Sequence, residues 1–279
     1  MLDDRKEQVS RVLAFRESSA QEFLVVLTEF SVVMPVHNEA RFLPYSLPSV
    51  YQLKPSEVIV LLDNCSNGSE KIVKEYSAKF GMTSKTRVIN PPMSDGWRMR
   101  FAFLRFLGCS LAGCPVVLVT GADVVLDSLI RRYLDILGEK VKFVSFGYVD
   151  YPFNWRNRLR RLLTVFLPRG FSKNWLSGIH AFFVKEAFEV EDLEELKQIE
   201  SAEDTLLHCA FQQKYRTEYL RTDTIHLRPR EGGRRHYLRG KLYWNVARRG
   251  WLVTLANGVL FLRLNLIKGY IHARLGGKK

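Results

Sequence analysis

The sequence predicts an α/β fold in which a mixed, mostly parallel sheet is flanked by helices. Apolar runs of strand length, such as Ser31–Val36 and Val58–Leu62, alternate with helical segments. Two buried strands joined by a helix form a βαβ unit with parallel strands. Both runs end in polar residues, and open α/β sheets bind ligands beyond the carboxyl ends of their strands. We therefore expect Glu39 and Asp63 to face a common crevice.

The later elements follow from apolar periodicity and from the residues that interrupt it. A surface helix is expected at 5–22, and a second helix at 69–80, capped by Ser69 or Asn67 and ended by Gly81. The other expected elements, in order, are a strand at 87–89, a helix at 97–112, strands at 116–119 and 143–147, a helix between Asp127 and Gly138, a strand at 179–184, a helix at 203–214 and a strand toward His226.

The composition restricts the class of protein. A chain of 279 residues with 47% hydrophobic residues can bury a sizeable core and is not disordered. Its net charge of +13, from 42 basic and 29 acidic residues, favours phosphates, nucleic acid or an anionic membrane as partners. The four cysteines form no CxxC pair, and the charged N-terminus lacks a signal-peptide pattern, which favours a cytoplasmic location.

The composition also suggests three regions: an N-terminal helix at 1–25, a catalytic α/β domain at 26–227, and a basic helical region at 228–279. The third region is rich in arginine and then turns apolar at 251–267, where Arg263 interrupts the run. A membrane-spanning helix needs about 20 apolar residues. The pattern instead suits an amphipathic helix on the cytoplasmic membrane face. A helical hairpin that covers the core with a solvated basic face remains the alternative.

Six short motifs occur in a fixed order at expected strand ends and helix starts. They are Val32–Glu39, Leu62–Ser69, Thr120–Asp123, Ser177–Gly178 before an apolar strand, Ala202–Leu206 and Ile225–His226. Together they resemble the motifs of glycosyltransferase family 2, whose nucleotide-sugar-dependent members have the GT-A fold. The resemblance runs from about Phe30 to Tyr243, roughly three quarters of the chain. It implies a GT-A (Rossmann-like) domain followed by a basic C-terminal appendage.

The resemblance implies a nucleoside-diphosphate sugar as donor. The residues that match donor-binding positions of the family are Pro35, Asn38, Glu39, Asp63, Arg100, Ala122, Asp123, Ser177 and Gly178. Carboxylates accept hydrogen bonds from base N–H groups and ribose hydroxyls, which suits Asp63 and Glu39. The structural alternatives are that Asp63 caps a turn, that Glu39 is solvated, and that Arg98 and Arg100 are helix-surface charges.

The donor diphosphate would require a divalent cation, Mg²⁺ or Mn²⁺. The resemblance implies Asp123 as a metal ligand and His226 as a second ligand from a distant part of the chain. Gly121 stands where the family has the first acid of its pair. The alternatives are that His226 is structural, that Asp123 is a carboxylate leading a helix, and that the protein is a degenerate, inactive homologue.

Inverting transfer requires a general base that takes the proton of the acceptor hydroxyl. The resemblance implies Asp204 in this role, with Glu203 supporting it. A carboxylate in the first turn of a helix would otherwise simply stabilise the helix dipole. A retaining transferase of the same fold would not need Asp204 as a base.

The acceptor is less constrained. The chain lacks the Q-x-x-R-W motif of processive polymer synthases; 234–241 occupies that place. The arginine-rich tail favours a lipid-phosphate acceptor, as in polyprenyl-phosphate sugar transferases, or a small hydroxyl acceptor. A sugar-phosphate nucleotidyltransferase is disfavoured because no glycine-rich basic loop follows the first strand. A non-enzymatic protein that binds membrane through its tail stays possible, whereas no nucleic-acid-binding motif is present.

Overall fold

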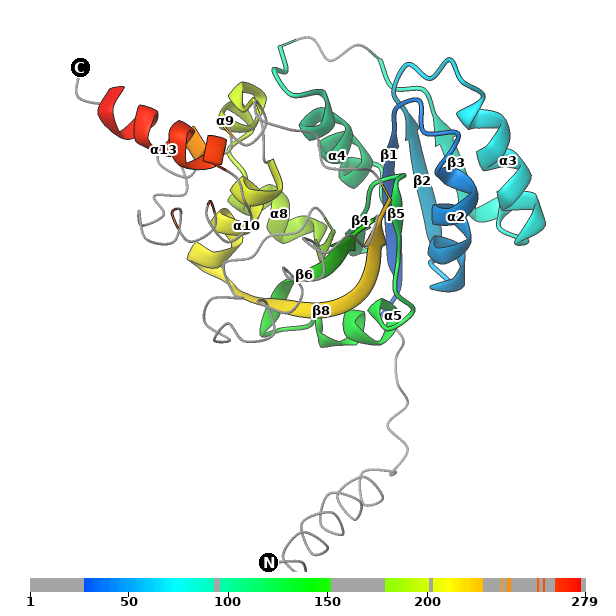
Figure 1. Cartoon of the computed structure of the whole chain (residues 1–279). Helices are drawn as coiled ribbons and strands as arrows, with labels where there is room; N and C mark the ends of the chain where they lie inside the picture. Colours follow the sequence, from blue (N-terminus) through cyan, green and yellow to red (C-terminus); the bar gives the residue numbers. More distant parts are fainter. Residues whose placement is uncertain are drawn as a thin grey trace, which may run out of the picture.

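The protein is built around one eight-stranded mixed sheet (Figure 1). A computed structural model describes residues 28–92, 96–151, 179–200, 203–227, 237, 240–241, 255, 258 and 264–276. The strand order is β3-β2-β1-β4-β7-β6-β8-β5. The strands are β1 (Phe30–Val36), β2 (Glu57–Leu62), β3 (Thr86–Ile89), β4 (Val116–Val119), β5 (Val124–Val125), β6 (Val141–Asp150), β7 (His180–Phe183) and β8 (Arg216–His226). The expected mixed, mostly parallel sheet is confirmed.

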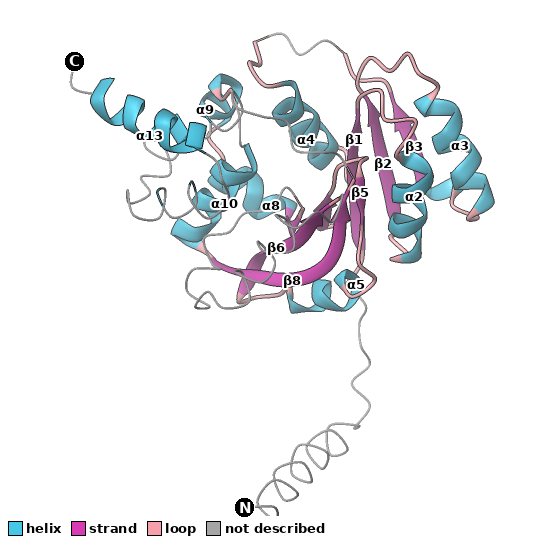
Figure 2. Cartoon of the chain, viewed as in Figure 1, coloured by secondary structure: helices cyan, strands magenta, loops and turns pink. Residues whose placement is uncertain are grey.

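Helices cover both faces of this sheet (Figure 2). The helices that the structure describes are α2 (Leu43–Gln52), α3 (Ser69–Lys79), α4 (Arg100–Ser110), α5 (Ile130–Tyr133), α8 (Val184–Val190), α9 (Leu193–Gln198), α10 (Glu203–Lys214) and α13 (Leu264–Gly276), with 3₁₀ turns at Thr83–Lys85 and Leu134–Ile136. Strands β3, β2, β1 and β4 are parallel, and β7 is antiparallel to its neighbours β4 and β6.

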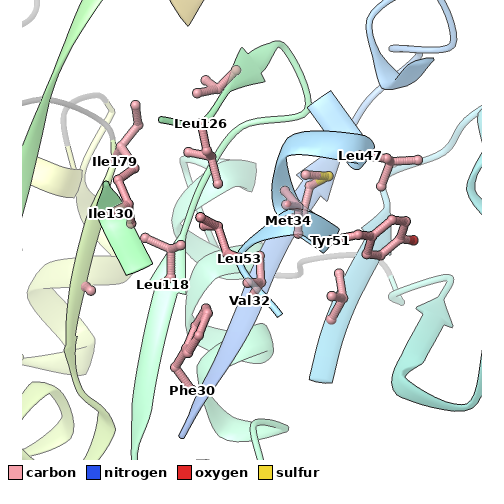
Figure 3. Close-up of a cluster of buried hydrophobic side chains, with 14 of the residues drawn as sticks. Phe30, Val32, Met34, Leu47, Tyr51, Leu53, Leu118, Leu126, Ile130 and Ile179 are labelled. Carbon is pink, nitrogen blue, oxygen red and sulfur yellow. The ribbon is translucent and has the colours of Figure 1, made fainter. Parts of the chain in front are cut away.

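Two apolar cores lie on opposite faces of the sheet. In β1, Val32 and Met34 pack on one face with Leu47 of α2, as Figure 3 shows, whereas Val33 packs on the other face with Leu104 of α4. All seven residues of β1 are buried. A strand covered on both faces has no solvated side, and this explains why the runs in β1 and β2 are continuously apolar rather than alternating.

Helix α4 lies unusually close to β1. A Cβ added to Gly108 would overlap the side chain of Val33 and would lie 3.1 Å from Leu61. Glycine at this position therefore lets the helix backbone approach the sheet, which fixes the place of α4 and of the arginines that it carries.

Several expected elements were placed correctly, and others differ for local reasons. The strand at 116–119 and the helix at 203–214 are present as expected. The expected helix at 97–112 spans only Arg100–Ser110, and the one after Asp127 is a single turn followed by a 3₁₀ turn. The strand expected at 179–184 ends at Phe183, where α8 begins. Short elements such as β5 and α9 carry too few residues for a periodic signal.

The expected cap of α3 is wrong. The N-cap residue is Gly68, with φ of 80°, and no side chain caps the helix. The Ser69 hydroxyl instead donates to Asn67 Oδ1 at 2.7 Å, so the two predicted caps bind each other. A glycine in the left-handed region makes this sharp entry to the helix possible.

The expected helix at 5–22 and most of the tail lie outside the described residues. Within the tail, α13 lies very close to Tyr237 and Gly240, because a Cβ on Gly240 would overlap the Leu266 backbone and one on Gly269 the Tyr237 backbone. The hydroxyl of Tyr237 lies 2.7 Å from His272 Nδ1. The helices that the structure describes include none long and apolar enough to cross a membrane.

Candidate active site

The first group of predicted site residues lies where β1 and β2 end. Asp63 follows β2, and its backbone N–H donates to Val36 O at 2.7 Å, which ties the two strand ends together. Its carboxylate accepts a hydrogen bond from Arg100 Nε at 2.7 Å. His37 Nδ1 lies 2.7 Å from Asp63 O and 3.7 Å from Asp63 Oδ2. The carboxylate is therefore bound by a cation and is 17% exposed, rather than capping a turn.

Arg100 is the first residue of α4, and its side chain is 26% exposed. Besides Asp63, it donates from Nη1 to Pro92 O at 2.7 Å and stacks over Phe103. The alternative of a solvated helix-surface charge is therefore wrong for Arg100. Arg98 is more exposed, at 59%, and pairs with Glu200 at 3.6 Å.

Asn38 and Glu39 follow β1 on the adjacent loop. Asn38 has a left-handed backbone, with φ of 54°, and its Oδ1 accepts from Ser66 N at 2.8 Å. Its side chain thus joins the loops after β1 and β2. Glu39 is only 7% exposed, so the alternative of a solvated residue is wrong. Pro35 is buried within β1, opposite Leu61 of β2.

The second group joins residues that are distant in the sequence. Strands β5 and β8 are antiparallel, with Val124 opposite His226, so Asp123 immediately precedes the paired segment. Asp123 Oδ2 lies 3.3 Å from His226 Nε2, and the Asp123 carbonyl accepts from Leu227 N at 2.8 Å. Asp123 leads a strand, so the alternative of a helix-leading carboxylate is wrong.

Gly121 explains how Asp123 is arranged. A Cβ at position 121 would lie 2.7 Å from Asp123 Oδ1 and 3.6 Å from Val124. The Asp123 carboxylate therefore lies over the glycine, in space that the side chain of an acid at 121 would need. Ala122 between them is buried, at 2% exposure.

The donor set at Asp123 and His226 fits a divalent cation. A carboxylate and an imidazole suit Mn²⁺ in particular, whereas Mg²⁺ prefers oxygen ligands. With metal–ligand bonds of about 2.1 Å, neighbouring ligands of one cation lie roughly 3 Å apart. The separation of 3.3 Å is compatible with that. Within the described part of the chain, no group of three or more such side chains is assembled.

The third group is the start of α10. Glu203 and Asp204 are each 6% exposed. Asp204 Oδ1 accepts from its neighbour Thr205, from the backbone N at 2.8 Å and from the hydroxyl at 3.4 Å. This fixes the rotamer of the carboxylate and leaves Oδ2 outside those two hydrogen bonds.

The sheet topology relates the first two groups. Strands β2 and β4 lie parallel on either side of β1, and Thr120 N donates to Val33 O at 3.1 Å. Asp63 and the 120–123 turn therefore leave the sheet at the same edge, the carboxyl ends of its parallel strands. Ser177 and Gly178 lie outside the described residues. His37 is not among the predicted site residues, because its contact with Asp63 depends on the geometry of the strand ends.

Comparisons with known proteins agree with this arrangement. Residues 31–184 match Glycosyl transferase family 2. No curated protein matches the chain at a significant level.

Solved structures share the fold at low sequence identity. The mannosyltransferase PcManGT from Pyrobaculum calidifontis, in complex with GDP-Man and Mn²⁺, has a TM-score of 0.61 and 16% identity over 97% of this chain and 84% of that one. TarS 1–349 from S. aureus with UDP has a TM-score of 0.57 and 16% identity over 85% of this chain and 74% of that one. Glucosyl-3-phosphoglycerate synthase from Mycobacterium tuberculosis, with Mn²⁺, UDP-Glc and phosphoglyceric acid, has a TM-score of 0.52 and 16% identity over 78% of this chain and 79% of that one.

The family match covers more than half of the chain and includes both Asp63 and the 120–123 turn. The mixed sheet with helices on both faces is the architecture of these solved neighbours. The chain therefore belongs to glycosyltransferase family 2 and is a glycosyltransferase with the GT-A fold.

Proposed function

We propose that this protein transfers one sugar, with inversion, from a nucleoside-diphosphate sugar to a hydroxyl or phosphate oxygen of a lipid-linked or small acceptor. The observation that supports this most is the Asp123–His226 pair, 3.3 Å apart at the edge where β5 meets β8. The pair offers a cation site beside the strand ends at which α/β folds bind their ligands.

In the donor site, Asp63 accepts hydrogen bonds from the base or ribose, and Arg100 balances diphosphate charge. The present contact between Arg100 Nε and Asp63 Oδ1 supports their common location. Pro35, Asn38, Glu39, Ala122 and the 177–178 loop complete the donor-binding set by their motif positions. Asp123 and His226 would hold the cation, Mn²⁺ or Mg²⁺, which would supply positive charge to neutralise the diphosphate.

In the chemical step, the acceptor oxygen attacks the anomeric carbon from the side opposite the diphosphate. When the acceptor is a hydroxyl, Asp204 takes its proton, whereas an ionised phosphate oxygen attacks without giving up a proton. In both cases the bond from the anomeric carbon to the diphosphate oxygen breaks, and the nucleoside diphosphate leaves with the bonding pair. The fixed rotamer of Asp204, with Oδ1 bound to Thr205, supports a base held in one position.

A lipid-linked acceptor is favoured by the surface of α13. Leu264, Ile271 and Leu275 are 69%, 48% and 67% exposed, and their spacing places them on one helical face. Lys268 and Arg274 lie on the same helix. An apolar stripe with basic neighbours suits peripheral contact with an anionic membrane face through the 228–279 region.

The test is turnover of GDP-, UDP- and dTDP-sugars, with Mn²⁺ and with chelator, measured as release of nucleoside diphosphate. We expect one donor class to be turned over only with metal. Asp204→Asn should lower kcat by about 10²-fold or more while donor binding persists. Asp123→Ala should lower turnover with Mn²⁺ to about the level that wild type shows with chelator. Asp135→Asn is the control, because Asp135 lies in the 3₁₀ turn after α5 and pairs with Arg131 at 3.5 Å.

Two outcomes would contradict the proposal in different ways. If no nucleoside diphosphate or its sugar binds, the protein is not an active transferase. If Asp204→Asn turns over at the wild-type rate, Asp204 is not the base, and a retaining mechanism replaces the inverting one.

A further inference from the structure

Helix α4 carries a second arginine, Arg105, which is 1% exposed and is the largest fully buried side chain described. Its guanidinium binds Glu191, just after α8, with both ends: Nη1 donates to Oε2 at 3.2 Å, and Nη2 donates to Oε1. The Glu191 side chain is 3% exposed. Because a planar guanidinium fork matches a carboxylate, such a pair fixes orientation as well as distance.

A second carboxylate acts on the same arginine. Burial alone would lower the pKa of Arg105, but the charge and hydrogen bonds of Glu191, together with the charge of Glu203, raise it above its ordinary value. Arg105 therefore stays charged inside the protein. Glu203 is the first residue of α10. The buried cation is thus bound to Glu191 after α8 and lies within the electrostatic influence of Glu203 at the start of α10.

Apolar packing brings α4 and α10 together. Ala102 of α4 and Leu206 of α10 belong to one buried cluster, with Leu196 of α9. The first turn of α10, from Glu203 to Leu206, therefore shares a buried apolar cluster with α4. Asp204 lies within that turn.

The N-terminal end of α4 contacts Asp63, which the proposed function places in the donor site. Arg100 binds Asp63 at 2.7 Å, and Arg105 follows on the same helix. An α-helix rises about 1.5 Å per residue, so the two arginines are separated by a rigid step of about 7.5 Å. One helix thus contacts the carboxylate at the end of β2 and the turn that carries Asp204.

We propose that Arg105 is a positioning residue that, through Glu191 and Glu203, fixes the first turn of α10 and so the place of Asp204 relative to the donor. This inference rests on the proposed function, because it assigns Asp204 as the base. A buried ion pair is weak support for stability, since apolar replacements are often as stable. The Arg105–Glu191 pair instead contributes a defined orientation of α10 against α4.

The test compares two replacements of the network with a matched control. Arg105→Met with Glu191→Leu replaces the pair by apolar side chains, so no buried charge of the pair is left without a partner. Arg105→Lys keeps the charge and loses the fork. The control is Lys142→Met with Glu186→Leu, which removes a part-buried pair, 2.8 Å apart, between β6 and α8.

The first measurement is steady-state release of nucleoside diphosphate from the donor that the wild type turns over. We expect the apolar pair to lower kcat by about tenfold or more while the donor KM changes by less than about twofold. Arg105→Lys should recover part of kcat, and the control should match wild type. An unchanged kcat in the apolar pair overturns the proposal, as does an equal loss in the control.

The second measurement is hydrogen exchange of backbone amides, which does not depend on activity. In the apolar pair, amides at 203–206 should exchange about tenfold faster, while those at 63–69 keep the wild-type rate. Equal exchange at 203–206 overturns the proposal even if the enzyme is active. If wild type turns over no sugar donor, the proposed function fails, and the exchange result alone decides whether Arg105 orders this turn.

Discussion

At the scale of single residues, Gly121 stands out because it marks where this chain departs from its family. The carboxylate of Asp123 lies over the glycine, 2.7 Å from where a Cβ would be. Real Cβ atoms do not approach oxygen so closely, so any side chain at 121 displaces Asp123. We infer that restoring an acid at 121 would disturb the Asp123–His226 pair rather than complete it.

Gly121→Ala should therefore weaken Mn²⁺ binding and lower turnover, by about tenfold or more if Asp123 moves by as little as 1 Å. Manganese titration monitored by nucleoside diphosphate release measures both. Gly138→Ala is the matched control, because a Cβ there meets nothing within 4 Å. Wild-type metal dependence in Gly121→Ala would show that Asp123 tolerates the added methyl group.

Individual residues also show the limits of prediction from sequence. Asp63, Asp123 and Asp204 are recognisable because each follows a strand or starts a helix within a motif. Arg105 gives no such signal, since one arginine in an apolar helix resembles a solvated charge until its partner is known. That partner, Glu191, is distant in sequence and lies between two short helices.

At the scale of elements, β2 begins with a carboxylate that joins several segments. Glu57 accepts hydrogen bonds from Ser31 at 2.6 Å and from the Gly113 backbone, and it pairs with Arg87 at 3.4 Å. Burial alone would raise its pKa, but these hydrogen bonds and the charge of Arg87 lower it overall. Glu57 thus links β2 to β1, to β3 and to the loop before β4.

This depressed pKa has a defined consequence for acid stability. A group whose pKa is lower in the folded protein stabilises it above the unfolded pKa, and this stabilisation is lost as the pH falls through the folded pKa. Glu57→Gln should therefore unfold at lower denaturant concentration near neutrality and lose less stability than wild type on acidification below the ordinary carboxyl range. Urea unfolding at several pH values measures this.

The control for that series is Glu70→Gln, which removes an exposed carboxylate of α3 that pairs with Lys74 at 2.6 Å. Exposed pairs of this kind contribute little, typically below about 1 kcal/mol. If Glu57→Gln and Glu70→Gln show the same dependence on pH, the interactions of Glu57 contribute nothing specific to acid stability.

Elements differ in how far sequence predicts them. The strands β1, β2 and β4 are predictable because burial on both faces makes them continuously apolar between clear turn signals. Strand β5, with two residues, has no pattern of its own and exists because β8 pairs with it. The family resemblance already suggests His226 as a partner of Asp123, and the pairing of β5 with β8 explains how the two residues meet.

At the scale of the whole molecule, the net charge of +13 and the exposed stripe of α13 predict binding to anionic membranes. The full chain should float with vesicles that contain anionic phosphatidylserine and not with neutral phosphatidylcholine vesicles, and binding should weaken as salt rises. Replacing Leu264, Ile271 and Leu275 by serine should reduce flotation without changing turnover of a soluble donor.

Replacing Leu129 and Ile136 by serine is the matched control, because both are 41% exposed but flank α5 rather than lying on α13. Equal loss of flotation in both sets would show that the stripe has no special role. Equal binding to neutral and anionic vesicles would contradict the electrostatic part of the proposal.

The antiparallel pairing of β5 with β8 has a consequence for biosynthesis. During translation, Asp123 leaves the ribosome well before His226, and the strand that must join them is inserted between β6 and β5 in the finished sheet. The nascent protein therefore cannot form the Asp123–His226 pair until β8 has emerged and entered the sheet. A fragment trimmed to residues 31–184 would include Asp63 and Asp123 yet never acquire His226.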